Sequence, residues 1–138
     1  PKNFKCLSFD NKAECIIKHA HDLLNSPYLW GGRTTWGLDC SGFSQYLYSL
    51  VGIQLPRDAS QQINFGQTCN FISEAQAGDL AFFDDEEGNI IHVGIIYEPG
   101  KIIHASGKVR IDRIDHQGIY NKNLKRYTHN LRVVKSLL

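Results

Sequence analysis

The hydrophobic pattern of this 138-residue chain changes its period close to Gly78, and this change constrains the fold more than any other feature. Before Gly78, apolar residues recur at the three- and four-residue spacing of amphipathic helices. After it, short β-branched or aromatic runs alternate with turn residues, which is typical of antiparallel strands. We therefore predict an α+β domain in which N-terminal helices pack on an antiparallel β-meander.

Three helices are expected before the change of period. The first begins near Asn11, which is spaced from Glu14 as in a capping box, and ends at residues 25–27. The second spans about Cys40 to Leu50, and a short third helix spans Pro56 to Phe65. The second half of the chain is expected to supply the strands Leu80–Phe83, Ile90–Tyr97, Lys101–Ser106, Val109–Ile114 and Arg132–Leu137.

Composition excludes several classes of protein. A hydrophobic fraction of 42% suits one domain with its own core, and a net charge of +1 gives no electrostatic reason to bind nucleic acid or an anionic membrane. No apolar run reaches the ~18 residues of a membrane-spanning helix, and no signal peptide is recognisable. The chain contains no Met and opens at Pro1, so we expect a processed or excised piece. In this interpretation residues 1–10 are a lead-in or the end of a linker, and residues 11–138 form a single domain.

The four cysteines are Cys6, Cys15, Cys40 and Cys69. They form no C-x-x-C pair, which weakens zinc-ribbon and thioredoxin interpretations. A chain of this size folds without disulfides, so we expect Cys6, Cys15 and Cys69 to be free thiols. A disulfide between Cys6 and Cys15 is the alternative.

Cys40 has the sequence context of a nucleophile. Asp39 is expected to cap the second helix, which places the thiol in the first turn, where backbone N–H groups and the helix dipole favour the thiolate. We therefore expect the pKa of Cys40 to lie below the free value of ~8.5. Ser41 and Gly42 are small, so a substrate carbonyl can approach the sulfur and the N–H groups that would hold an oxyanion.

His92 and His104 lie on two consecutive strand-like runs that a hairpin joins. A loop with an odd number of residues, in which Tyr97 faces Lys101, would place both imidazoles on one side of the hairpin. A two-residue turn at residues 99–100 would place them on opposite sides. We expect the shared side, with His92 as the general base for the thiol and His104 as the residue that orients it.

The other titratable clusters have a plainer interpretation. An acidic run at residues 84–89 precedes the strand of His92, and we interpret it as a solvated turn rather than a groove wall that selects cationic ends. The remaining histidines are expected to face solvent or to be structural: His19, His21, His116 and His129.

Five blocks of the sequence, taken in order, resemble the NlpC/p60 family of cell-wall cysteine peptidases. They span nearly the whole chain, and five blocks in one order are much more specific than any single block. One departure is Ala59, which stands where many members carry a serine. The blocks lie within residues 28–43, 55–62, 77–83, 92–97 and 103–106.

The resemblance implies a papain-like fold and hydrolysis of peptidoglycan stem peptides. The typical bond joins the γ-carboxyl of D-glutamate to a diamino acid such as meso-diaminopimelate or lysine. Carried over position by position, the resemblance makes Cys40 the nucleophile, His92 the general base and His104 the third, orienting residue. Tyr28 would lie over the thiol and help to hold the oxyanion. The substrate groove would be lined by Asp39, Ser41, Arg57 and Asp58.

The resemblance also carries expectations about substrate ends, partners and location. In the subgroup that acts on released muropeptides, acidic residues near these places hold the free amine of the terminal L-alanine. No metal or organic cofactor is expected. Src-homology-3-like domains often precede the catalytic domain in this family, and we expect a monomer without a membrane span. A secreted, periplasmic or cell-envelope location is favoured, with cytoplasmic recycling of muropeptides as the alternative.

Two other functions stay open at this point. One is a related cell-wall amidase or acyltransferase that uses the same nucleophile. The other is a peptidoglycan-binding module that has lost catalysis.

Overall fold

The computed structural model describes residues 11–25, 33–34 and 37–138. None of the helices in these ranges is long and apolar enough to cross a membrane. The elements follow one another as α1 (Lys12–Asp22), β1 (Arg33–Thr34), β2 (Gly37–Leu38), α2 (Cys40–Ser49), α3 (Ala59–Gln62), β3 (Gln67–Cys69), a 3-10 turn (Ile72–Glu74), β4 (Leu80–Asp84), β5 (Ile90–Glu98), β6 (Lys101–Ser106), β7 (Lys108–Asp115), β8 (Gly118–Asn121) and β9 (Arg126–Ser136).

Both long helices begin where local sequence signals place them. Asn11 accepts a hydrogen bond from the backbone N–H of Glu14 at 3.2 Å and caps α1. Asp39 accepts one from the N–H of Gly42 at 2.7 Å and caps α2, so Cys40 is the first helical residue, as predicted.

The third helix is shorter than predicted. α3 covers only Ala59–Gln62, whereas the sequence suggested Pro56 to Phe65. The N–H groups of Asn64 and Phe65 bond to carbonyls three residues back, so the chain leaves the α-helix through tighter turns.

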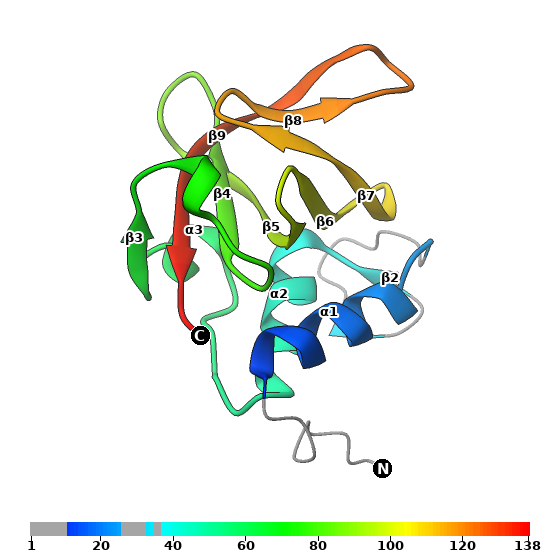
Figure 1. Ribbon diagram of the computed structural model, residues 1–138, viewed down its shortest axis with the longest axis vertical. Helices are drawn as coiled ribbons and strands as arrows, with labels where there is room; N and C mark the ends of the chain where they lie inside the picture. Colours follow the sequence, from blue (N-terminus) through cyan, green and yellow to red (C-terminus); the bar gives the residue numbers. More distant parts are fainter. Residues whose placement is uncertain (1–10, 26–32, 35–36) are drawn as a thin grey trace.

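Seven strands form an antiparallel sheet in the order β3-β9-β4-β5-β6-β7-β8, and β8 also pairs with β9. The predicted α+β fold with its meander is confirmed. The meander closes into a barrel because the first half of β9 pairs with β8 and the second half pairs with β4 (Figure 1). β9 starts at Arg126, six residues before the predicted start at Arg132. The short strands β3 and β8 were not predicted.

Two hydrophobic cores lie on opposite faces of the sheet. Val93 and Ile95 face the side on which α2 packs and contribute to one core with Phe43 of that helix. Phe83 and Ile102 belong to a second core inside the barrel. Because successive residues of a strand alternate between faces, His92 shares the inner face with Gly94, close to the start of β5.

A bulge in the β5–β6 hairpin brings the two histidines to the same face. Glu98 pairs with Lys101, so the turn has two residues and the predicted odd loop is wrong. β5 carries a bulge at Tyr97 directly before that pair, and the extra residue restores the facing register that the sequence suggested. His92 and His104 are consequently diagonal neighbours.

Gly94 leaves the space that His104 occupies. A Cβ built on Gly94 would lie 2.8 Å from the Cβ of His104 and 2.7 Å from Cδ1 of Ile102. Only glycine therefore fits at this position of β5 without displacing its neighbours.

The structure also tests the expectations about the cysteines and about the acidic run at residues 84–89. Cys15 is disulfide-bonded, so the expectation of a free thiol there is wrong; Cys69 is free, as predicted, and Cys6 lies outside the described residues. The acidic run is an exposed turn, in which Asp85 accepts the N–H groups of Glu87 and Asn89, each at 2.9 Å.

Candidate active site

Cys40 lies at the N-terminus of α2, with its sulfur against β5. The thiol is partly buried and free, and backbone N–H groups of Val93, Ser41 and Cys40 itself are directed to it. Burial raises the pKa of the thiol, and the charge of Asp39 adds to this effect, whereas the N–H groups oppose it. The predicted low pKa is therefore wrong for the resting protein, because removal of the sulfur from water outweighs the N–H donors.

His92 and His104 form a buried pair. Nε2 of His92 lies 2.8 Å from Nδ1 of His104, and the side chains belong to residues that are 6% and 1% exposed. Burial lowers the pKa of His92 well below its ordinary value, and the pKa of His104 is lowered for the same reason. Both imidazoles are consequently neutral at neutral pH, which suits a general base.

A carboxylate behind His104 was not predicted. Nε2 of His104 lies 2.8 Å from Oδ2 of Asp112, and Arg110 donates to both oxygens of the same carboxylate, at 2.8 and 3.1 Å. Hydrogen bonds from His104 and Arg110 lower the pKa of Asp112 against the effect of its burial. The sequence did hold a signal: alternation places Arg110 and Asp112 on the same face of a strand as the buried Ile114.

His129 completes the histidine cluster, a contact that was not predicted. Its ring stacks on that of His92, with centroids 4.2 Å apart and an angle of 28° between the planes. Phe83 contacts both rings. Burial lowers the pKa of His129 to about 4. No strand was predicted at this position, so the sequence did not indicate that His129 lies beside β5. The other three histidines outside the pair are exposed or partly exposed, as predicted.

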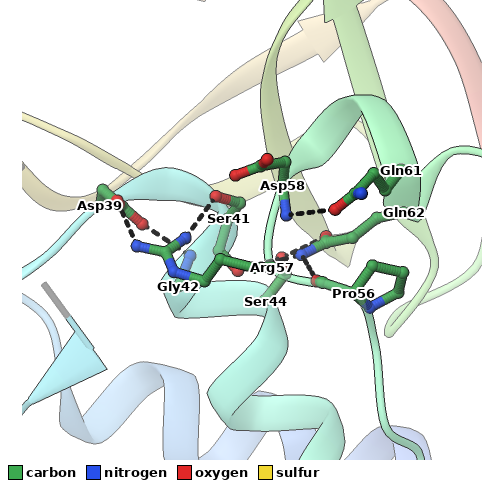
Figure 2. A network of polar contacts seen from close by, with 9 residues as sticks. All are labelled: Asp39, Ser41, Gly42, Ser44, Pro56, Arg57, Asp58, Gln61 and Gln62. Atoms are coloured by element: carbon green, nitrogen blue, oxygen red, sulfur yellow. Dashed lines mark hydrogen bonds and ion pairs between the residues drawn. The ribbon is translucent and has the colours of Figure 1, made fainter. Parts of the chain in front are cut away.

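Three of the four predicted groove residues meet at the start of α2 (Figure 2). Arg57 forms an ion pair with Oδ2 of Asp39 at 2.7 Å and donates to Oγ of Ser41 at 2.9 Å. Asp39 is almost fully buried, while a third of the Arg57 side chain is exposed. Asp58 lies one residue further on as the exposed N-cap of α3, and Tyr28 lies outside the described residues.

A buried amide fixes Arg57 relative to α2. Gln62 of α3 donates from Nε2 to the carbonyls of Ser41, at 3.1 Å, and Pro56, at 2.9 Å. Its Oε1 accepts the hydroxyl of Ser44 at 2.7 Å. These bonds connect the segment before α3 to the first turn of α2. They therefore hold the backbone next to Arg57 at a position from which its side chain reaches Asp39 (Figure 2).

The described residues contain no cluster of three or more His, Cys, Asp or Glu side chains that could hold a metal ion. They do form a thiol at a helix start, against the strand that carries a neutral imidazole, and a second imidazole holds that ring. Such an arrangement can perform nucleophilic acyl transfer.

Sequence comparison agrees with this geometry. The sequence model of the NlpC/P60 family matches residues 25–129. The chain belongs to the NlpC/P60 family. A gamma-D-glutamyl-L-lysine dipeptidyl-peptidase of Bacillus subtilis is 42% identical over 95 residues, which cover 67% of this chain and 32% of the relative. The chain thus spans about a third of the length of this relative.

Solved structures of NlpC/P60 proteins share the fold. A family member from Bacillus cereus superposes with a TM-score of 0.78 at 27% identity, over 91% of this chain and 40% of that one. The peptidoglycan hydrolase RipB of Mycobacterium tuberculosis gives a TM-score of 0.73 at 26% identity, over 92% of this chain and 65% of that one. The α+β architecture described above is therefore that of NlpC/P60 domains.

Proposed function

We propose that this NlpC/P60 domain is a cysteine peptidase that cleaves peptidoglycan stem peptides at the γ-D-glutamyl–diamino acid bond, through a thioester on Cys40. One observation carries the proposal: the sulfur of Cys40 lies against the N–H of Val93, the neighbour of His92, whose ring is held by His104. The name of the Bacillus subtilis relative supports the γ-D-glutamyl specificity, and RipB supports peptidoglycan as the polymer.

The proposed reaction begins with a proton transfer. His92 takes the proton from the thiol of Cys40, and the sulfur attacks the carbonyl carbon of the γ-glutamyl group. N–H groups of Cys40 and Ser41 at the start of α2 donate to the oxyanion, whereas the N–H of Gly42 is already bonded to Asp39.

The second half of the reaction returns the protein to its starting state. The imidazolium of His92 gives its proton to the leaving amine of the diamino acid, and the thioester remains on the sulfur. Water then attacks the thioester with His92 as base, which releases the glutamyl product and restores the thiol.

Residues around the nucleophile divide into two roles in this proposal. Arg57 and Asp58, both reachable from solvent, meet charged ends of the stem peptide. Tyr28, outside the described residues, keeps the role in the oxyanion site that the family resemblance implies. Asp39 and Ser41 hold the guanidinium of Arg57 in place. A cell-wall or extracellular site of action follows from the substrate class.

The test is mass spectrometry of products from defined muropeptides that end in lysine or in meso-diaminopimelate. The wild-type chain should release a fragment that begins with the diamino acid, and Cys40→Ala should release none. Cys69→Ala is the matched control, because Cys69 is a second free thiol that the mechanism does not use.

Two results would contradict the proposal. Unchanged turnover by Cys40→Ala would exclude Cys40 as nucleophile. Binding of muropeptides by the wild-type chain without any product would instead identify a binding module, and cleavage at another amide would identify an amidase.

A further inference from the structure

Four side chains form an unbroken polar chain behind the candidate base. His92 bonds to His104, His104 bonds to Asp112, and Arg110 holds both oxygens of Asp112. The side chains of His104 and Asp112 are 1% and 6% exposed, so water does not compete for these bonds. The chain reaches from β5 across β6 to β7.

The donors and acceptors in this chain can be assigned only one way. A neutral imidazole has one N–H and one accepting nitrogen, whereas an ionised carboxylate only accepts. Arg110 keeps the carboxylate of Asp112 ionised, so the proton of His104 lies on Nε2 and its Nδ1 accepts. Nδ1 of His104 faces Nε2 of His92 at 2.8 Å, and that nitrogen must then carry the proton of His92.

The remaining nitrogen of His92 is the one that the reaction needs. With its proton on Nε2, His92 has a lone pair on Nδ1, and only an unprotonated nitrogen can accept the proton of the thiol. The opposite tautomers would place an N–H on Nδ1 of His92 and leave the carboxylate of Asp112 facing the lone pair of His104. That state buries an acceptor against an acceptor.

We propose that Asp112, held by Arg110, is a positioning residue that sets the tautomers of both His104 and His92 and thereby keeps Nδ1 of His92 free to accept the proton of Cys40. The inference rests on the proposed function for its catalytic consequence but not for the tautomers themselves. A single proton moves, from Sγ of Cys40 to Nδ1 of His92. The charge of Asp112 stabilises the imidazolium that forms, and no proton leaves His104.

The tautomers can be measured directly by nitrogen-15 NMR of the histidine rings in the wild-type protein. We expect the proton on Nε2 in both His92 and His104. A proton on Nδ1 of either ring would overturn the proposal. This measurement needs neither substrate nor a variant, so it stands even if the muropeptides are not cleaved.

Asp112→Ala tests the consequence. Without the carboxylate, the rings are expected to populate the opposite tautomers, and kcat should fall by roughly a hundredfold, the scale of a positioned general base, with little change in KM. Asp115→Asn on the same strand is the matched control, because Asp115 bonds to Tyr127 and not to a histidine, and it should leave tautomers and kcat unchanged.

The outcomes separate the possible failures. Unaltered tautomers in Asp112→Ala would show that Asp112 does not set them. If Asp112→Ala does not fold, the nearly isosteric Asp112→Asn is used instead. Full kcat in the folded variant, together with altered tautomers, would show that the tautomers do not control the reaction. Absence of turnover in the wild-type chain, with both protons on Nε2, would contradict the proposed function and leave the tautomer assignment intact.

Discussion

At the scale of single residues, Asp39 acts both on the start of α2 and on the thiol of Cys40. Its Oδ1 caps α2, while its negative charge raises the pKa of the neighbouring Cys40 thiol and so opposes formation of the thiolate. Arg57 offsets this charge from 2.7 Å. Asp39 can therefore cap α2 without disfavouring the thiolate of Cys40 only while its ion pair with Arg57 is intact.

Arg57→Ala should weaken both functions of Asp39. A buried carboxylate would lose its charged partner, so we expect the free energy of unfolding to fall by about 1–3 kcal/mol and the pKa of the Cys40 thiol to rise further. Chemical denaturation and the pH dependence of thiol alkylation measure the two effects. Arg132→Ala, which removes the exposed ion pair with Asp84, is the control and should cost less than about 1 kcal/mol. Equal losses in the two variants would count against the argument.

The pH dependence of turnover should reflect the burial of His92. Because burial keeps the pKa of this base well below 6.5, His92 stays unprotonated in mildly acidic solution. We expect kcat/KM to stay level as the pH falls through 6.5 and to decline only at distinctly lower pH. A pH–rate profile on a muropeptide measures this, and an inflection at the ordinary histidine pKa would contradict it.

At the scale of elements, the β5–β6 hairpin determines whether the two imidazoles meet. The bulge at Tyr97 sets the parity of the pairing, and Gly94 provides the space into which His104 fits. Both features act on backbone geometry rather than on the chemistry of the rings.

Gly94→Ala should therefore impair catalysis through packing. The added methyl group would lie 2.8 Å from the Cβ of His104, and overpacking of this kind costs about 1–3 kcal/mol. We expect kcat to fall even under conditions in which the variant is fully folded, because the added methyl group pushes His104 away from His92. Ile95→Val, a core change of about 1 kcal/mol on the opposite face of β5, is the control and should retain kcat. Activity assays and thermal unfolding of both variants decide between displacement and general destabilisation.

Elements that depend on local signals could be predicted from the sequence. The caps Asn11 and Asp39 gave the helix starts, and alternation gave the cores of β4 to β7. For the β5–β6 hairpin, the prediction that both histidines share one face was confirmed, but the predicted length of the turn was wrong. The bulge at Tyr97, which accounts for the difference, has no recognisable sequence signal.

Elements that depend on distant pairing could not be predicted. β3, β8 and the first half of β9 are short or polar, and they are strands because the barrel closes around them. For the same reason His129 was not placed beside His92. Asp112 is different, because it lies only eight residues from His104 on the next predicted strand, where alternation already gave a signal. The pair of His92 and His104 was predicted because both residues lie on one hairpin.

At the scale of the whole molecule, the barrel buries three imidazole rings, and burial favours their neutral form. Burial lowers the pKa of His92, His104 and His129 below their values in an unfolded chain. As the pH falls below 6.5, the unfolded chain takes up protons that the folded protein does not, so acidification favours unfolding.

We expect the melting temperature to fall steadily between pH 6.5 and 4, the interval set by the unfolded value and by the pKa of about 4 for His129. His129→Phe keeps an aromatic ring against His92 but removes a titrating group, so it should reduce the slope. His116→Asn, at an exposed position, should leave the slope unchanged. Calorimetry at a series of pH values measures this, and identical slopes in all three proteins would contradict the argument.

Closure of the barrel by β9 also has a consequence for the order of events during synthesis. A ribosome releases β4 to β8 before β9, and until residues 126–136 emerge, β4 and β8 are both open edges. Pairs between β9 and β4 or β3 join residues from 46 positions apart (Asp84 and Asn130) to 69 positions apart (Gln67 and Ser136), so we expect them to form later than the local hairpins. A nascent chain that ends before residue 126 already carries Cys40, His92 and His104, yet its sheet is open and the His129 ring that stacks on His92 is missing. The closed barrel around His92 is thus complete only once β9 has paired with both β8 and β4.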